Sequence, residues 1–169
     1  MSLPDEPLIE MDGPAETPPG EPIAPRIRGL VASQSFAVLC TQGEGQPYGS
    51  LVAYACEDDL TSAVFATSKA TRKFRLLCEC DHVALLIDNR PEFPDDLMRI
   101  EAVTVTGRAR LLEDPHGRQA AGDFLAARHP YLRHFVRSDS CGLFRVDIVR
   151  FLHVCRFQEV RQWVPTKDT

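Results

Sequence analysis

Short apolar runs ended by turn-forming residues recur along the chain from residue 36 onward, and this pattern constrains its fold most strongly. Runs this short, rich in Val, Phe, Thr and Tyr, are typical of strands, because a helix needs an apolar face at a 3.6-residue period. We predict strands at residues 36–41, 48–56, 63–67, 83–87 and 99–112, and one or two more at residues 141–150 and 151–164. A parallel sheet would need a crossover helix between most strands, and few helical segments are present. The chain is therefore predicted to be mainly β, a closed or partly closed antiparallel barrel with peripheral helices.

A few segments have helical character instead. We predict an entry helix at residues 26–35 and a helix at residues 68–80 that Ser68 caps. A further helix is expected to start at Asp114 and Pro115 and to run to Ala127, followed by a short one at residues 131–136.

The first 25 residues differ from the rest of the 169-residue chain. They hold six acidic side chains, no Lys or Arg, and seven of the 13 prolines. Proline has no backbone N–H and restricts the residue before it, so we expect neither a helix nor a central strand here. We predict an extended or disordered acidic arm at residues 1–25 and one folded domain at residues 26–169.

The composition argues against several classes of protein. No run of about 18 apolar residues is present, so no membrane-spanning helix is predicted. The acidic, proline-rich start is unlike a secretory signal peptide, so the six cysteines are expected to be reduced thiols in the cytoplasm. The net charge of −5 argues against a nucleic-acid partner.

Three hydroxyls and two cations gather where a predicted strand gives way to a helix, in the segment FATSKATRKFRLL at residues 65–77. They belong to Thr67, Ser68, Thr71, Arg72 and Lys73. Free backbone N–H groups and the positive end of the helix dipole attract an anion at such a junction, and a guanidinium can hold two phosphate oxygens. The segment therefore predicts a phosphate site; the alternative is a capped surface helix with solvated cations.

Several segments resemble, in order and spacing, those of one known family. They are GQPYGSLVAYA (residues 45–55), VFATSKATRK (64–73), VALLIDN (83–89), EAVTVTGRARLLED (101–114), FLAARHP (124–130) and LFRVDIVRFLHVCRFQEVRQWVP (143–165). Together they resemble the pyridoxamine 5′-phosphate oxidase-like family of FMN-binding split barrels. They are more similar to its branch of flavin-binding and haem-utilisation proteins than to the true pyridoxamine phosphate oxidases.

The resemblance implies a homodimer that binds FMN in a cleft between its two subunits. Arg72 and Lys73 match the pair that holds the phosphate in this family. With Thr71 added for its chemistry, the predicted cofactor-binding residues are Ser50, Leu51, Val52, Ala66, Thr67, Ser68, Thr71, Arg72, Lys73 and Asn89. The chemistry of such a site belongs to the cofactor, and we predict an FMN-dependent oxidoreductase of unknown substrate.

The chain also departs from the family. Where true pyridoxamine phosphate oxidases carry an Arg on the second strand and a Gln on the long strand, it has Ser50 and Ala102, which disfavours vitamin B6 oxidation. The glycines typical of the last turn in the haem-utilisation branch are missing from CRFQEV, residues 155–160. The alternatives are a non-catalytic flavin- or haem-binding protein in stress response or cofactor handling, and binding of the deazaflavin F420, which also carries a phosphate.

The cysteines do not predict a metal site. Cys78 and Cys80 point to different faces of the predicted helix and would need further ligands, such as His82. The remaining cysteines are expected to be small buried side chains. They are Cys40, Cys56, Cys141 and Cys155.

Overall fold

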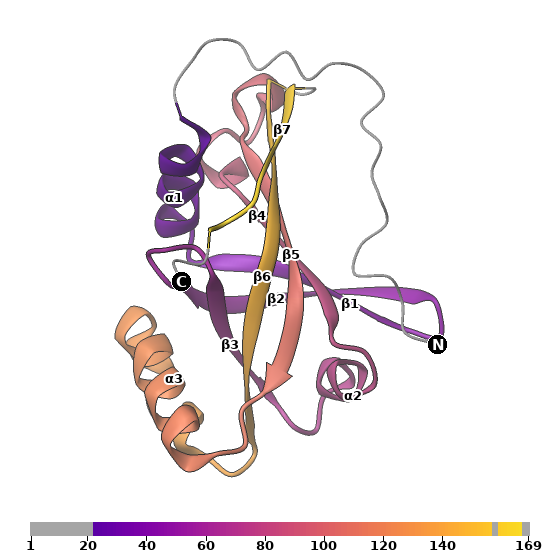
Figure 1. Ribbon diagram of the computed structural model, residues 1–169, viewed down its shortest axis with the longest axis vertical. Coiled ribbons are helices and arrows are strands. Elements are labelled where there is room, and N and C mark those ends of the chain that lie inside the picture. The colour runs from indigo at the N-terminus through magenta and orange to yellow at the C-terminus, as the bar shows by residue number, and fades with distance from the viewer. Residues whose placement is uncertain (1–21, 157–158, 167–169) are drawn as a thin grey trace.

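The described part of the chain is built on one seven-stranded antiparallel sheet. The computed structural model describes residues 22–156 and 159–166. The strands are β1 (Phe36–Gly43), β2 (Gln46–Cys56), β3 (Ser62–Ser68), β4 (His82–Asp88), β5 (Ala102–Leu111), β6 (Cys141–Cys155) and β7 (Glu159–Trp163). They lie in the order β3-β2-β1-β4-β5-β6-β7, and a further pairing of β3 with β6 closes the first six into a barrel (Figure 1). The predicted mainly β barrel is confirmed.

Strand β6 belongs to two parts of the sheet at once. One edge pairs with β5, whereas the other pairs with β3 over residues 141–147 and with β7 over residues 151–155. Between these stretches the N–H of Ile148 donates to the carbonyl of Thr61 at 2.9 Å. Of the one or two strands predicted here, two are present, but they are divided at Arg156, whose φ is 46°, and not near residue 150.

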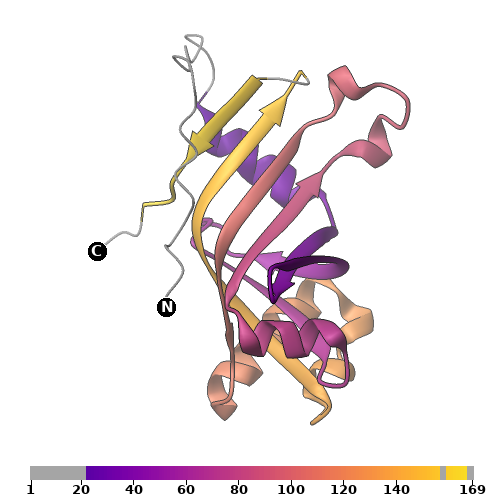
Figure 2. The ribbon, with the colours of Figure 1, turned by 90° about the vertical axis from the view of Figure 1, so that its right-hand side faces the viewer.

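Within the described ranges, three α-helices lie against this sheet. They are α1 (Ile23–Ser33), α2 (Arg72–Glu79) and α3 (Pro115–Arg128), and 3-10 turns lie at η1 (Arg90–Glu92), η2 (Leu97–Arg99), η3 (Pro130–Leu132) and η4 (Phe135–Arg137). Figures 1 and 2 show α1 along the upper part of the sheet and α3 near its lower end. Helix α2 packs on β1, and α3 contacts β2, β3 and β6. None of these helices is long and apolar enough to cross a membrane.

Helix α1 starts earlier than its sequence predicted. It begins at Ile23, with Pro25 in its first turn, where a missing N–H costs nothing because that group has no intrahelical acceptor. The expectation of no helix before residue 26 is therefore wrong for residues 23–25. Pro22 precedes the helix as its N-cap, and residues 1–21 of the expected arm lie outside the described residues.

The C-terminal end of α1 is held by a side chain from α3. The guanidinium of Arg128 donates to the carbonyls of Val31 and Ala32, each at 3.1 Å, and to that of Gln34. It also lies over the ring of Tyr54, 5.1 Å from the centroid. Orphan carbonyls at the helix end are satisfied in this way, and α1 is fixed relative to α3.

Aromatic and branched side chains fill the barrel. The rings of Phe65 and Phe144 are fully buried and stack with their centroids 5.4 Å apart. A second cluster around Leu125 and Leu143 joins α3 to the same strands, β3 and β6. Full burial of one such side chain contributes roughly 1.5–3 kcal/mol, so packing on both sides fixes β3, whose end leads into α2.

The cysteines follow the alternation of their strands. Cys141 and Cys155 are buried as predicted, and Cys56 is half-buried. The expectation for Cys40 is wrong, because its neighbours Leu39 and Thr41 take the inward positions of β1 and leave Cys40 exposed on the outer face.

Candidate functional site

Strands β2 and β3 separate soon after the turn that joins them. They form three residue pairs, and beyond the pair of Tyr54 with Phe65, β2 continues with β1 while β3 continues with β6. Residues 50–52 and 66–68 therefore lie on two diverging strands. The structure brings these predicted site residues to the two sides of one split in the sheet.

Thr71 directly precedes α2, and its hydroxyl is fully used in hydrogen bonds within the junction. Its Oγ1 accepts from the N–H of Phe74 at 3.2 Å and donates to the carbonyl of Ser68 at 2.8 Å. The hydroxyl of Thr67 lies 3.0 Å away and must donate to Thr71, whose proton is already engaged. The Ser68 hydroxyl accepts from Ala70 N–H at 3.3 Å and keeps its own proton. Thr71 and not Ser68 is therefore the N-cap, and of the three hydroxyls that of Ser68 can donate to a ligand.

The first two residues of α2 are the cations Arg72 and Lys73. In the part of the chain that the structure describes, neither forms an ion pair, and Arg72 lies instead over the ring of Tyr48, 5.2 Å from its centroid. Lys73 is half-buried, and this burial lowers the pKa of its ammonium. Positive side chains are unfavourable at a helix N-terminus, which is itself positive. This end of α2 carries uncompensated positive charge that an anion would stabilise.

Strand β2 offers an apolar surface on its outer face. Leu51 is 68% exposed, whereas Val52 is buried. Ser50 lies on the same face as Val52, and its buried hydroxyl has no hydrogen-bond partner within the described residues. Leu51 and the β2 backbone are therefore the groups that a flat ring would meet, and the hydroxyl of Ser50 is not.

Asn89 lies away from this cluster, beside a partly buried ionic network at the end of the sheet that α1 covers. Its side-chain oxygen accepts from the N–H of Glu101 at 2.8 Å. The Glu101 carboxylate accepts from Arg26 Nε and from His153 Nε2, each at 3.0 Å. Within one chain the structure does not bring Asn89 to the start of α2.

The network shifts the pKa values of two of its members. The hydrogen bonds from Arg26 keep the pKa of Glu101 below its usual value. Burial lowers the pKa of His153, whose side chain is fully enclosed. Because His153 Nε2 donates to Glu101, its Nδ1 carries no proton, and this buried atom has no hydrogen-bond partner among the described residues.

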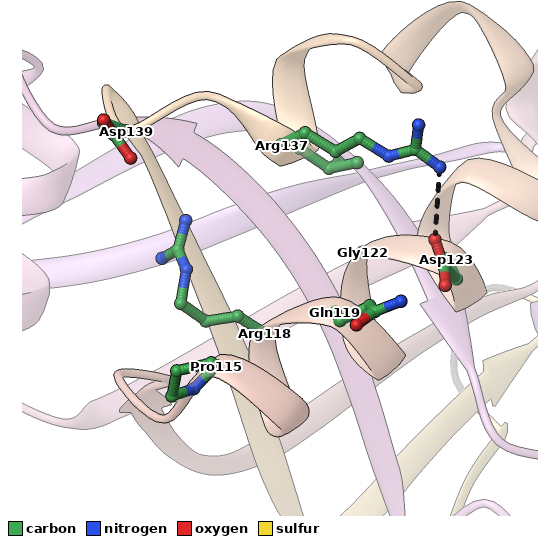
Figure 3. Close-up of a pocket in the computed structure, with 8 residues that line it drawn as sticks. Pro115, Arg118, Gln119, Gly122, Asp123, Arg137 and Asp139 are labelled. Atoms are coloured by element: carbon green, nitrogen blue, oxygen red, sulfur yellow. Dashed lines mark ion pairs between the residues drawn. The ribbon is translucent and has the colours of Figure 1, made fainter.

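A separate pocket of about 460 Å³ opens between α3 and η4 (Figure 3). Its charged lining residues are Arg118, Asp123, Arg137 and Asp139. Arg118 donates to the carbonyl of Cys141 at 3.1 Å, and Arg137 lies 3.8 Å from Asp123. Two positive and two negative charges balance here, and no predicted site residue lines this pocket. It therefore favours an anion less than the start of α2 does.

The closed six-stranded barrel, the split between β2 and β3 and the cationic start of α2 define a split β-barrel protein with a positively charged strand–helix junction. Residues 23–155 match the family described as Pyridoxamine 5'-phosphate oxidase, and the chain belongs to this family, as the resemblance predicted. No curated protein sequence matches the chain.

Solved structures similar to this chain include proteins that are described as binding different cofactors. A heme-binding protein from Mycobacterium smegmatis has a TM-score of 0.76 at 19% identity, covering 86% of this chain and 59% of that protein. ChuZ from Campylobacter jejuni has a TM-score of 0.72 at 10% identity, covering 84% and 59%. A FAD-binding protein from Mesorhizobium loti has a TM-score of 0.61 at 16% identity, covering 77% and 92%. The chain spans about three fifths of the first two proteins, and at these identities the likeness shows the fold.

Proposed function

We propose that this chain binds FMN and that the start of α2 holds the FMN phosphate. The observation that carries this proposal is the uncompensated pair of cations Arg72 and Lys73 at the N-terminus of α2. Membership of the family supports a flavin as the group attached to that phosphate. The deazaflavin F420 carries the same phosphate and is the alternative ligand for this junction.

Each group at the junction has its own role in this proposal. The Ser68 hydroxyl and the backbone N–H groups of Arg72 and Lys73 donate hydrogen bonds to phosphate oxygens. The guanidinium of Arg72 holds two oxygens, and Lys73 adds a point charge whose lowered pKa rises again beside the anion. Thr67 and Thr71 hold the turn itself, because their hydroxyls are bonded to each other.

The flavin ring lies against β2 in this proposal. Leu51 gives it an apolar contact, the backbone of residues 50–52 faces its polar edge, and the short side chain of Ala66 leaves room beside it. A bound flavin supplies hydride or electron transfer, while the protein binds and orients it. We therefore propose a flavin-dependent oxidoreductase acting on a small molecule. Its six cysteines are all free thiols, which fits a cytoplasmic protein.

We further propose that the protein is a homodimer with FMN between its subunits. Support comes from apolar side chains on the outer faces of β1 and β2, where Phe36 is 50% and Leu51 is 68% exposed. Covering them with a second copy removes this surface from water. Light scattering with FMN present is expected to give twice the 18.9 kDa chain mass, and a monomer mass would contradict the dimer.

A non-catalytic flavin- or haem-binding role is the second candidate, and the likeness to the heme-binding protein favours it. Haem iron needs an axial ligand, often His. Two of the histidines are unsuited to this, because His129 is buried with its Nε2 2.8 Å from the carbonyl of Tyr54, and His153 is buried against Glu101. With two of the five histidines unsuited as axial ligands, we place haem second to a flavin whose phosphate lies at Arg72 and Lys73.

Fluorescence titration of the full chain with FMN and with riboflavin, which lacks the phosphate, tests the proposal. FMN is expected to bind more tightly. Arg72→Ala removes a charge-assisted contact of roughly 1.5–3 kcal/mol, which lowers FMN affinity about 10- to 100-fold at ~1.4 kcal/mol per decade.

Arg75→Ala is the matched control, because Arg75 lies on the same helix but is exposed and 4.0 Å from Glu79. It is expected to leave FMN affinity nearly unchanged. An Arg72→Ala variant that binds FMN as the wild type does would contradict the phosphate site. A shifted and sharpened Soret band on adding haemin, relative to free haemin, with no binding of FMN, would favour the second candidate.

A further inference from the structure

We infer that Tyr48 is the positioning residue for Arg72 and thereby sets the affinity of the site for the phosphate; this inference rests on the proposed function. The guanidinium carbon of Arg72 lies 5.2 Å from the centroid of the Tyr48 ring. The two residues come from different elements, the β1–β2 hairpin and the first turn of α2. Their contact holds Arg72, the more exposed cation of the junction, from outside its own helix.

The hairpin that carries Tyr48 is itself held firmly. Tyr48 pairs with Thr41 across the hairpin, and the buried Thr41 hydroxyl donates to the carbonyl of Tyr48 at 3.3 Å. Nearby, Gly43 lets Leu76 of α2 approach so closely that an added Cβ would lie 2.4 Å from Leu76 Cδ2. The hairpin and α2 are therefore packed as a unit, and the Tyr48 ring has a defined place relative to Arg72.

An aromatic ring positions an arginine side chain in a different way than a carboxylate does. A carboxylate would fix Arg72 but neutralise it and occupy the N–H donors that a phosphate needs. The ring of Tyr48 attracts the guanidinium without a counter-charge, so the charge of Arg72 is kept and no carboxylate occupies its N–H donors. Since neither Arg72 nor Lys73 forms an ion pair within the described residues, Tyr48 supplies the orientation without competing for the ligand.

The test compares variants of Tyr48 by titration with FMN and riboflavin. Tyr48→Leu and Tyr48→Gln both remove the ring, whereas Tyr48→Phe keeps it and removes only the hydroxyl. A cation–π contact at a partly exposed site corresponds to about a two- to fivefold change in dissociation constant. We expect this loss of FMN affinity in the two ringless variants, wild-type affinity in Tyr48→Phe, and unchanged riboflavin affinity in all three.

A double variant completes the test. In an Arg72→Ala background, Tyr48→Leu should cause no further loss of FMN affinity, because the ring acts through Arg72. Equal FMN affinity in Tyr48→Leu, Tyr48→Gln and Tyr48→Phe would overturn the inference, and so would a parallel loss of riboflavin affinity. These outcomes differ from failure of the proposed function, in which the wild type does not distinguish FMN from riboflavin and Arg72→Ala changes nothing.

Discussion

Glu101 is expected to be a main determinant of stability, because it joins helix α1 to strand β6. Its carboxylate accepts hydrogen bonds from Arg26 of α1 and from His153 of β6. Replacing it by Gln keeps the size of the side chain but removes its negative charge. The guanidinium of Arg26 then loses this counter-ion, and the imidazole of His153 loses a charged acceptor.

The magnitude follows from the exposure of the pair. The side chain of Arg26 is 34% and that of Glu101 is 23% exposed, so the pair lies between two measured limits. Exposed pairs contribute ~0–1 kcal/mol, whereas breaking a buried one costs about 3–5 kcal/mol. We expect Glu101→Gln to lower the free energy of unfolding by ~2 kcal/mol. At about 2–4 °C per kcal/mol, this corresponds to a fall in Tm of roughly 4–8 °C.

Urea unfolding at pH 8, followed by tryptophan fluorescence, measures this loss. Trp163 is the one tryptophan of the chain, and its ring lies 5.5 Å from that of Phe151 in β6, close in sequence to His153. Glu113→Gln is the matched control, since Glu113 is exposed and has no ion pair within the described residues. A Glu101→Gln variant within about 0.5 kcal/mol of this control would refute the reasoning.

Three further changes test other contacts of the fold. Because the folded state lowers the pKa of His153, the unfolded state binds more protons below the ordinary value of about 6.5. The stability of the wild type should therefore fall from pH 8 to pH 5, and the slope of Tm against pH should be smaller in His153→Gln. Equal slopes in the two proteins would contradict this. Arg128→Ala should lower the free energy of unfolding in urea by about 1–3 kcal/mol. Arg128→Lys should recover little of this stability, because an ammonium lacks the planar fork that reaches the last carbonyls of α1. Full recovery of stability in Arg128→Lys would count against that explanation. Gly107→Ala should lower the free energy of unfolding by roughly 1–3 kcal/mol, because its Cβ would lie 2.4 Å from the carbonyl oxygen of Asp147. In Gly29→Ala the added Cβ meets nothing within 4 Å, so this control should be neutral or stabilising by the same measurement. Similar changes in stability for the two variants would be inconsistent with the close approach at Gly107.

Most strands of the fold were predictable because alternation and turn residues are local signals. The predictions failed where the structure of a segment depends on contacts with residues distant in the sequence. Residues 148–155 continue one strand because β7 replaces β3 along the edge of β6, and no local signal marks that exchange. Cys40 was predicted to be buried because its run is apolar throughout, and only the register decides that Leu39 faces the core. The prolines of residues 1–25 argue against a helix, although the first turn of a helix tolerates Pro25.

The candidate site was likewise predictable only where its residues are close together in the sequence. The segment around Arg72 and Lys73 was found because its charge and hydroxyls are contiguous, but three hydroxyls competed for the N-cap and the structure selects Thr71. Tyr48 was missed because it meets Arg72 only through the register of the β1–β2 hairpin. An aromatic residue beside a Gly-rich turn was its one signal in the sequence. The pairing of Glu101 with His153, 52 residues apart, had none.

The exchange of partners along β6 bears on how the protein loses its structure. A single continuous backbone segment forms a wall of the barrel and also holds β7, the strand that α1 contacts. If either part unfolded alone, one portion of β6 would lose the backbone hydrogen bonds to its neighbouring strand while the rest of β6 stayed ordered. Subglobal openings are thereby discouraged, and the amide protons of β6 should exchange with solvent mainly through global unfolding. A cut or a circular permutation within this strand would break both parts at once, whereas one in a peripheral loop would break neither.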